Sequence, residues 1–248
     1  MEHGIHVVLK AEELGHLWGF PITNALVMTW VVMALIFLFV FLVNRRISLV
    51  PGHTQTILEW GVEGGMSYMT ETLGDVKLAK RFFPLLATLF FFILVGNELA
   101  FFPGVGSIGF FHGEELVPLL RAPATDLNMT LALTLISVLV IEISGIIAVG
   151  LWRYGGKFIN FSSPVNFVVG LIELVSETAR LVTFSFRLFG NIFAGEVLIA
   201  IVAMFVPYVV PVPFMLFEMF VGFVQALIFA LLTLFFIKLA VTPAHESH

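Results

Sequence analysis

The chain has 248 residues, of which 59% are hydrophobic and 12% are charged, and its formal net charge is −5. Soluble domains usually contain about 25% charged residues, so this composition excludes an ordinary soluble protein and indicates a membrane protein with several crossings. The lack of cysteine excludes disulfides, thiolate metal sites and cysteine nucleophiles. No basic stripe suited to nucleic acid is present. We expect one integral membrane domain over residues 1–248.

Apolar runs separated by polar or proline-containing segments predict the elements in chain order. The expected elements are an N-terminal segment at 1–21, spans at 22–43, 82–102 and 127–152, and longer helices at 165–206 and 214–240. The two longer runs exceed the roughly 20 residues that a perpendicular helix needs, so we expect them to be tilted and to form a hairpin. Residues 55–74 mix apolar and acidic side chains, which predicts a helix on the membrane interface. The fold class is therefore an all-α membrane protein with about five crossing helices plus one interfacial helix.

The lysine and arginine residues predict the orientation of these spans. If the N-terminus lies outside, only Lys10 and Arg121 are outside. The residues that then lie on the cytoplasmic side are Arg45, Arg46, Lys77, Lys80, Arg81, Arg153, Lys157 and Lys238. This bias requires five crossings and places the C-terminus in the cytoplasm.

An arginine inside the longest apolar run is the strongest functional signal. Arg187 lies near the middle of 165–206, where an ionisable group costs about 2.5–3.5 kcal/mol on insertion scales and is a functional-site hypothesis by default. Helical spacing puts it in one polar stripe with other residues of the run. The stripe consists of Glu173, Glu177, Arg180, Arg187 and Asn191. We therefore expect this helix to act on ions.

Carboxylates on either side of Arg187 predict two separate proton paths. Glu173 and Glu177 lie toward the cytoplasmic end of the long helix, whereas Glu196 lies toward the outer end and near the opposite face from Arg187. In an antiparallel hairpin Glu196 shares its depth with Glu218. Carboxyl groups can pass protons, whereas arginine stays charged because its pKa is above about 12. The pattern thus predicts two half-paths that Arg187 keeps apart. The same register places Arg187 near the depth of Gln225 in the last helix.

Several segments resemble subunit a of the F-type ATP synthase, bacterial type. Residues 186–196, FRLFGNIFAGE, match its most specific signature, and residues 225–229, QALIF, match a motif of its last helix. Residues 97–104 and 123–128 resemble two other recurring patches. The resemblance covers most of the chain from about Ile22, in order.

The resemblance implies a proton path at the edge of a rotating c-ring. Arg187 matches the essential stator arginine, which engages each rotor carboxylate as it passes. Glu196 and Gln225 match family positions, and Glu173 matches a carboxylate on the cytoplasmic side. Glu218 stands where some members carry histidine.

The resemblance also implies partners and a location. The partners are the c-ring, b-type peripheral stalk subunits, the F1 sector indirectly, protons and membrane lipid. The location is the bacterial inner membrane. The chain itself carries no catalytic site, and we expect no cofactor and no metal. Two alternatives of other classes stay open: a secondary ion transporter, which predicts inverted repeats and broken helices, and a non-conducting membrane scaffold. Sodium in place of the proton is also open.

Three further residues have structural interpretations beside functional ones. Arg180 stands where other family members have lysine, and it can equally form a local pair with Glu177 on its own helix. Glu142 in the third span predicts a hydrogen bond to another helix. Asp126 is as consistent with a helix cap as with a place in the path.

Two motifs are set aside. Residues 104–109 fit G-x-G-x-x-G, but they follow a membrane span and no βαβ unit surrounds them, so a dinucleotide site is not expected. The pairs His3/His6 and His245/His248 have spacing typical of metal ligands but lie at the chain ends.

Overall fold

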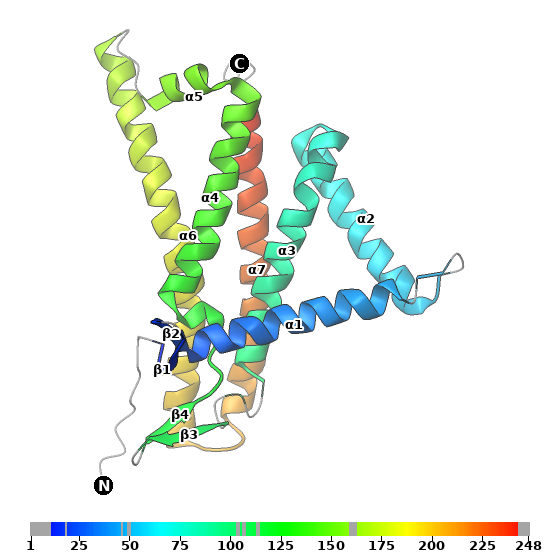
Figure 1. Cartoon of the computed structure of the whole chain (residues 1–248), viewed down its shortest axis with the longest axis vertical. Helices are drawn as coiled ribbons and strands as arrows, with labels where there is room; N and C mark the ends of the chain where they lie inside the picture. The colour runs from blue at the N-terminus through cyan, green and yellow to red at the C-terminus, as the bar shows by residue number, and fades with distance from the viewer. Residues whose placement is uncertain are drawn as a thin grey trace.

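The structure of the chain is a computed structural model that describes residues 11–17, 19–45, 47–48, 51–102, 105, 108–112, 115–158 and 163–242. Over these residues it forms seven α-helices and two antiparallel strand pairs (Figure 1). Five helices are long and apolar enough to cross a membrane. This confirms the predicted all-α membrane fold, with two small strand pairs added to it.

The chain enters its first long helix through a strand pair. Strand β1 (Glu13–Leu17) pairs with β2 (Phe20–Thr23), and α1 (Asn24–Asn44) follows directly. The span expected from residue 22 starts two residues later because Thr23 caps the helix. Its hydroxyl accepts a hydrogen bond from the backbone N–H of Leu26 (3.2 Å), which satisfies one of the free donors at the helix start.

Helix α2 (His53–Leu73) lies where the interfacial helix was expected. Met69 is its one buried residue, and Trp60 is 77% exposed. The helix ends at Gly74, whose φ of 72° is in the left-handed region that glycine adopts without a steric penalty. An exposed mixture of apolar and acidic side chains suits a helix that lies along a membrane surface.

The next two spans both begin at an aspartate cap. Helix α3 (Val76–Ala100) follows Asp75, and α4 (Leu127–Val149) follows Asp126. Each Oδ1 accepts the backbone N–H two residues further on, at 2.7 and 2.9 Å respectively. The first cap moves the start of α3 ahead of the expected residue 82. The second shows that Asp126 caps its helix.

A second strand pair and a short 3₁₀ helix connect α3 to α4. They are β3 (Gly109–His112), β4 (Glu115–Pro118) and η2 (Pro123–Thr125). The side chain of Asn24 donates its amide hydrogen to the Pro118 carbonyl (3.2 Å). The start of α1 is therefore tied to this connection.

The span expected at 127–152 is divided in two. Helix α4 ends at Val149 because Gly150 takes φ 90° and ψ 142°, which is outside helical geometry. Helix α5 (Leu151–Phe158) then forms a separate short element. The sequence interpretation did not foresee α5.

The last two helices are the longest. Helix α6 (Pro164–Phe205) has 42 residues and α7 (Pro211–Val241) has 31. Proline is tolerated in the first helical turn because a backbone N–H there has no partner within the helix. Helix α7 can therefore begin ahead of the expected residue 214. At about 1.5 Å per residue α6 is about 63 Å long, roughly twice the hydrocarbon thickness of about 30 Å.

The helices form a bundle with one exception in direction. Helices α4, α6 and α7 run alongside one another with α3 beside α7, whereas α1 runs across them (Figure 1). Helices α1 and α6 therefore cannot both stand perpendicular to a membrane, and the length of α6 makes it the one that fits by tilting. We call the end of the bundle with α5 and the C-terminus the α5 end, and the end with β3, β4 and the α6–α7 turn the hairpin end.

Aromatic packing joins α6 to α7. The Phe184 ring lies 5.5 Å from that of Phe229 and 5.7 Å from that of Phe236, measured between centroids. Leu188 and Ile192 on the same face of α6 are also buried. These contacts confirm the antiparallel hairpin and fix its register.

Candidate functional site

Arg187 lies on the exposed side of α6. Its neighbours Phe184 and Leu188 are buried against the bundle, whereas Arg187 itself is exposed. Among the residues that the structure describes, Arg187 forms no hydrogen bond or salt bridge. Its positive charge, in the middle of a 42-residue apolar helix, is therefore open to a group from outside the chain.

Other polar side chains form two groups, one toward each end of the bundle. Toward the α5 end a group of interacting side chains, the α5-end cluster, comes from α4, α5 and α6. It consists of Glu142, Tyr154, Lys157, Glu173, Glu177 and Arg180. Toward the hairpin end a second group, the hairpin-end cluster, comes from α3, α6, α7 and the segment before η2. It consists of Asn97, Glu98, Arg121, Glu196, Glu218 and Gln225. Asn191, half-buried, lies one turn beyond Arg187.

Lys157 is the cation of the α5-end cluster. Its Nζ lies 2.5 Å from Glu173 Oε1 and 3.1 Å from Glu177 Oε1. Burial alone lowers the pKa of Lys157, but the hydrogen bonds to the two carboxylates outweigh it, so the pKa is raised above its ordinary value. Lys157 thus stays charged at neutral pH and ties α5 to α6.

Tyr154 is the neutral donor of the same cluster. Its hydroxyl donates a hydrogen bond of 2.9 Å to Glu142 Oε2, which confirms the predicted bond from Glu142 to another helix. Burial, and then this bond to the carboxylate, raise the pKa of Tyr154 well above its ordinary value. The carboxyl groups of Glu142 and Glu177 lie within hydrogen-bonding range of each other.

Arg180 does not form the local ion pair that was one of its two interpretations. Its guanidinium carbon lies 3.8 Å from the centre of the Phe236 ring on α7, a cation–π contact. The carboxylate of Glu177 pairs instead with Lys157. Arg180 Nε is buried and has no hydrogen-bond partner among the described residues.

At the hairpin end, Glu218 packs directly onto α6. It is 7% exposed, and a Cβ placed on Gly195 would lie 2.5 Å from Glu218 Cδ. The contact sets Glu218 beside the residue that precedes Glu196, which confirms the depth expected for this pair. In the described part of the chain Glu218 Oε2 has no hydrogen-bond donor.

Gln225 lies about two helical turns deeper on α7 than Glu218 and is also buried, with Nε2 unpartnered among the described residues. Between it and Glu218, the Gly222 carbonyl accepts a hydrogen bond from Asn97 Nδ2 (3.2 Å). A Cβ on Gly222 would lie 3.8 Å from Glu98 Oε1. The close approach of α3 and α7 thus brings the carboxyl group of Glu98 to the hairpin-end cluster. No sequence motif assigned a role to this residue.

Glu196 is half-buried and lies within electrostatic range of Arg121. Arg121 in turn donates from Nε to the hydroxyl of Thr125 (3.1 Å). The sequence had assigned Arg121 only to the outer loop. Its proximity to Glu196 depends on the packing of the α3–α4 connection against α6, which no local pattern shows.

Tyr154 and Lys157 are the site residues that the sequence interpretation missed most clearly. Lys157 was counted only as a cytoplasmic charge, and Tyr154 was not singled out. Their spacing of three residues puts them on one face of a helix, but that signal is readable only when 151–158 is known to be helical.

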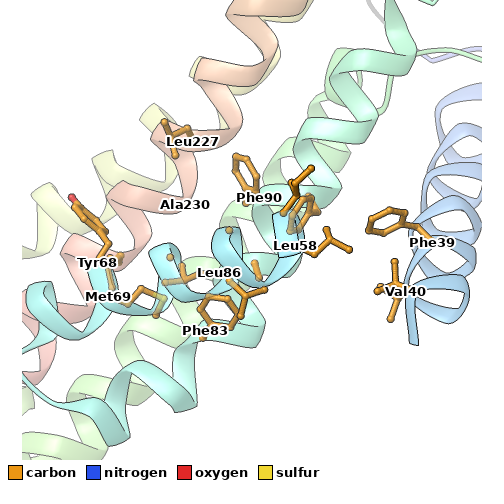
Figure 2. Close-up of a pocket in the computed structure, with 18 of the residues that line it drawn as sticks. Phe39, Val40, Leu58, Tyr68, Met69, Phe83, Leu86, Phe90, Leu227 and Ala230 are labelled. Carbon is orange, nitrogen blue, oxygen red and sulfur yellow. The ribbon is translucent and has the colours of Figure 1, made fainter. Parts of the chain in front are cut away.

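A large cavity lies away from both clusters. It has a volume of about 800 Å³ between α1, α2, α3 and α7. Apolar side chains line most of it, including Phe39, Phe83 and Leu227 (Figure 2). A cavity of this kind offers no path for protons, and it is not the candidate site.

Some sequence interpretations fall outside the described residues. These are the two histidine pairs, the orientation signals Lys10 and Arg46, and half of the glycine-rich motif at 104–109, namely residues 104, 106 and 107. The described part of the N-terminal segment 1–21 begins at residue 11.

Comparisons with known proteins show the family of the chain. The family model described as ATP synthase A chain matches residues 26–238. A protein named ATP synthase subunit a from Moorella thermoacetica is 33% identical, over 92% of this chain and 95% of the relative. Proteins of the same name from Desulforamulus reducens and Campylobacter jejuni are 35% and 34% identical, over 98% and 83% of this chain and 88% and 84% of the relatives. The chain belongs to the ATP synthase A chain family.

Proposed function

We propose that this chain is the proton-translocating stator subunit in the membrane sector of an ATP synthase. It provides two offset half-paths to a rotor c-ring, and Arg187 separates them. Its N-terminus lies outside and its C-terminus in the cytoplasm of a bacterial inner membrane. The chain performs no covalent chemistry, and ATP is made elsewhere in the complex.

The exposed guanidinium of Arg187, which has no partner among the described residues, is the observation that supports this proposal most strongly. A charge in the middle of an apolar helix is costly unless an opposite charge or water meets it. A deprotonated rotor carboxylate provides that charge each time it passes. Arginine suits the task because it does not lose its proton and its planar fork binds a carboxylate at two points.

The two clusters supply the half-paths. A proton enters past Glu196 and Glu218 at the hairpin end, passes to a rotor carboxylate, and leaves at the α5 end near Glu173 and Glu177 after the ring has turned. Gln225 of the hairpin-end cluster, Arg180 of the α5-end cluster and Asn191 line the route toward Arg187. The membrane potential contributes about 2.3 kcal/mol per proton per 100 mV to this transfer.

The continuous course of α6 and α7 over their described residues argues against a secondary transporter. Transporters of that class hold their substrate at interrupted helices near the middle of the membrane. The exposed Arg187 likewise argues against a passive scaffold, because a structural arginine would be paired within its own chain.

The substitution Arg187→Lys in the assembled complex tests the proposal. We expect proton-driven ATP synthesis to be lost while assembly stays normal, because lysine keeps the charge but lacks the fork and can lose its proton in an apolar site. ATP synthesis by inverted membrane vesicles measures the effect, with Arg153→Lys on the exposed side of α5 as the matched control. Synthesis near the wild-type rate with lysine at 187 would overturn the separator role.

A further inference from the structure

We propose that Glu142 and Glu177 share one proton and act as the relay of the exit half-path, held in place by Tyr154 and Lys157 of α5. This inference rests on the proposed function and adds Glu142, Tyr154 and Lys157 to it. Glu142 and Glu177 are the relay residues, and Tyr154 and Lys157 are positioning residues.

The geometry of the two carboxyl groups indicates a shared proton. Glu142 from α4 and Glu177 from α6 lie within hydrogen-bonding range of each other. Two ionised carboxylates placed so close together repel each other, whereas one proton between them removes the repulsion and gives both a hydrogen-bond partner. Tyr154 donates its hydrogen bond to Glu142 Oε2, whereas Glu142 Oε1 is buried and has no donor among the described residues. A proton on the pair provides the missing donor.

The charges around the pair also indicate one bound proton. Three carboxyl groups of the α5-end cluster, Glu142, Glu173 and Glu177, face two cations. Lys157 contacts two of the carboxylates directly, and Arg180 lies within electrostatic range of Tyr154. Helix α7 contributes the Phe236 ring to this region. Three acids and two cations are electrically neutral when one proton is bound, and neutrality favours burial in a medium of low dielectric constant.

The position of the pair suits a relay. Glu177 precedes Arg187 by ten residues on α6, about 15 Å along the helix axis. Glu173 lies one turn further toward the helix start, and its side chain is 34% exposed compared with 12% for Glu177. A proton released by a rotor carboxylate near Arg187 passes to the pair, and the pair then releases it to water near Glu173. The proton moves between oxygen atoms, and no other bond changes.

Two glycines allow α5 to reach the pair. A Cβ on Gly145 of α4 would lie 2.8 Å from Tyr154 Cζ, and one on Gly170 of α6 would lie 2.9 Å from the backbone carbon of Phe158. Real Cβ atoms do not approach other atoms so closely, so α5 fits between α4 and α6 only because both positions lack a side chain. This fit places the Tyr154 hydroxyl on Glu142 and the Lys157 ammonium on Glu177.

The test uses the complete ATP synthase in proteoliposomes with Glu142→Gln, Glu177→Gln and the control Glu63→Gln. Glutamine at 142 can still accept the Tyr154 hydrogen bond and donate to Glu177, so a purely structural role survives this change. Glu63 is an exposed carboxylate on α2. The readouts are ATP-driven proton pumping as a function of pH and the infrared C=O stretch of a protonated carboxyl group.

We expect pumping to fall by about tenfold in either relay variant, equivalent to about 1.4 kcal/mol of barrier, with the control unchanged. The carboxylic acid band should disappear in both single variants because the proton belongs to the pair. Wild-type pumping in Glu142→Gln overturns the inference, and so does a carboxylic acid band that stays intact in this variant.

Two further variants keep the result interpretable. Arg187→Lys in the same membranes reports on the proposed function: if it is inactive while Glu142→Gln pumps normally, only the relay fails. If the glutamine variants do not assemble, Tyr154→Phe removes one hydroxyl from the site. We expect it to retain the infrared band but to shift the pH dependence of pumping, and an unchanged pH profile overturns the inference.

Discussion

The two ends of α6 hold their carboxyl groups in opposite ways. At the α5 end, Glu173 and Glu177 contact Lys157, and Glu142 accepts a hydrogen bond from Tyr154. At the hairpin end, Glu218 is buried against a glycine, and its Oε2 has no donor among the described residues. The first arrangement fixes side chains in place. The second leaves a buried acid whose hydrogen bonds must come from water or a transferred proton.

Under the proposed function, this difference suits one helix to two separate paths. A tethered cluster keeps its geometry while a single proton moves through it, whereas a carboxyl oxygen without a donor among the described residues exchanges a proton readily with whatever reaches it. Arg187 lies between the two, exposed and open to a group from outside the chain. Substitutions at Arg187, at the hairpin end and at the α5 end test this comparison.

Removing the separator should have the largest effect. With Arg187→Ala we expect coupled ATP synthesis to be lost and the membrane to become passively leaky to protons once the catalytic head is stripped. An opposite charge at about 4–6 Å lowers a carboxyl pKa by about 1–3 units, so without it a rotor site can cross between the half-paths still protonated. Decay of a pH gradient in stripped vesicles measures the leak.

The control for this leak is a variant of the rotor carboxylate, which blocks conduction altogether. Vesicles of Arg187→Ala that hold a gradient as well as this control would show that the arginine is needed for conduction and is not a barrier.

Removing a carboxyl group at the hairpin end should have the next largest effect, on the rate of proton pumping. We expect Glu218→Gln or Glu196→Gln to slow proton pumping by about tenfold, a barrier change of about 1.4 kcal/mol, with a larger effect in the double variant. Each change keeps the shape of the side chain and removes its exchangeable proton. Dye-quenching assays on reconstituted complexes give the rates. If single and double variants all pump at the wild-type rate, protons enter by another route.

Much of this comparison could be read from the sequence, because it depends on length and register. The five long helices follow from apolar runs, and the depth of Glu218 follows from counting residues along an antiparallel hairpin. The α5 end could not be read in the same way. The break at Gly150 depends on a backbone conformation with φ 90°, which glycine permits but does not require.

Tertiary packing decided the remaining contacts. Arg180 had a carboxylate within reach on its own helix, yet the Phe236 ring of α7 lies against it. Lys157 comes to Glu173 and Glu177 only because α5 folds back over α6. Partners that are distant in the sequence and unrelated in pattern leave no local signal, whereas the family motif around Arg187 did.

A smaller effect should follow from adding one methyl group at the α6–α7 contact. A Cβ at Gly195 would lie 2.5 Å from Glu218 Cδ, whereas one at Gly190 on the same helix meets nothing within 4 Å. We expect Gly195→Ala to destabilise the chain by about 1–3 kcal/mol and to displace Glu218, while Gly190→Ala is tolerated. Thermal unfolding and pumping of both variants test this, and equal behaviour of the two would contradict the close contact.

The smallest expected effect is the response of the α5 tether to pH. The pKa values of Lys157 and Tyr154 are both raised, the first by the carboxylates that outweigh its burial and the second by burial and the bond to Glu142. A lysine or tyrosine whose folded pKa is raised stabilises the tether fully below its ordinary pKa, about 10.4 or about 10, and this contribution is lost as the pH rises through the folded value.

Because the chain has no cysteine, Trp152→Cys gives a single labelling site on α5, where the side chain is 91% exposed. A spin label there should keep the same mobility throughout the neutral range and become more mobile only above about pH 10, whereas a label at Trp60→Cys on α2 should not follow this transition. Adding Lys157→Met should mobilise the α5 label already at neutral pH. A label that loosens near neutrality in the chain with Lys157 intact would mean that carboxyl groups, not Lys157 and Tyr154, hold α5 in place.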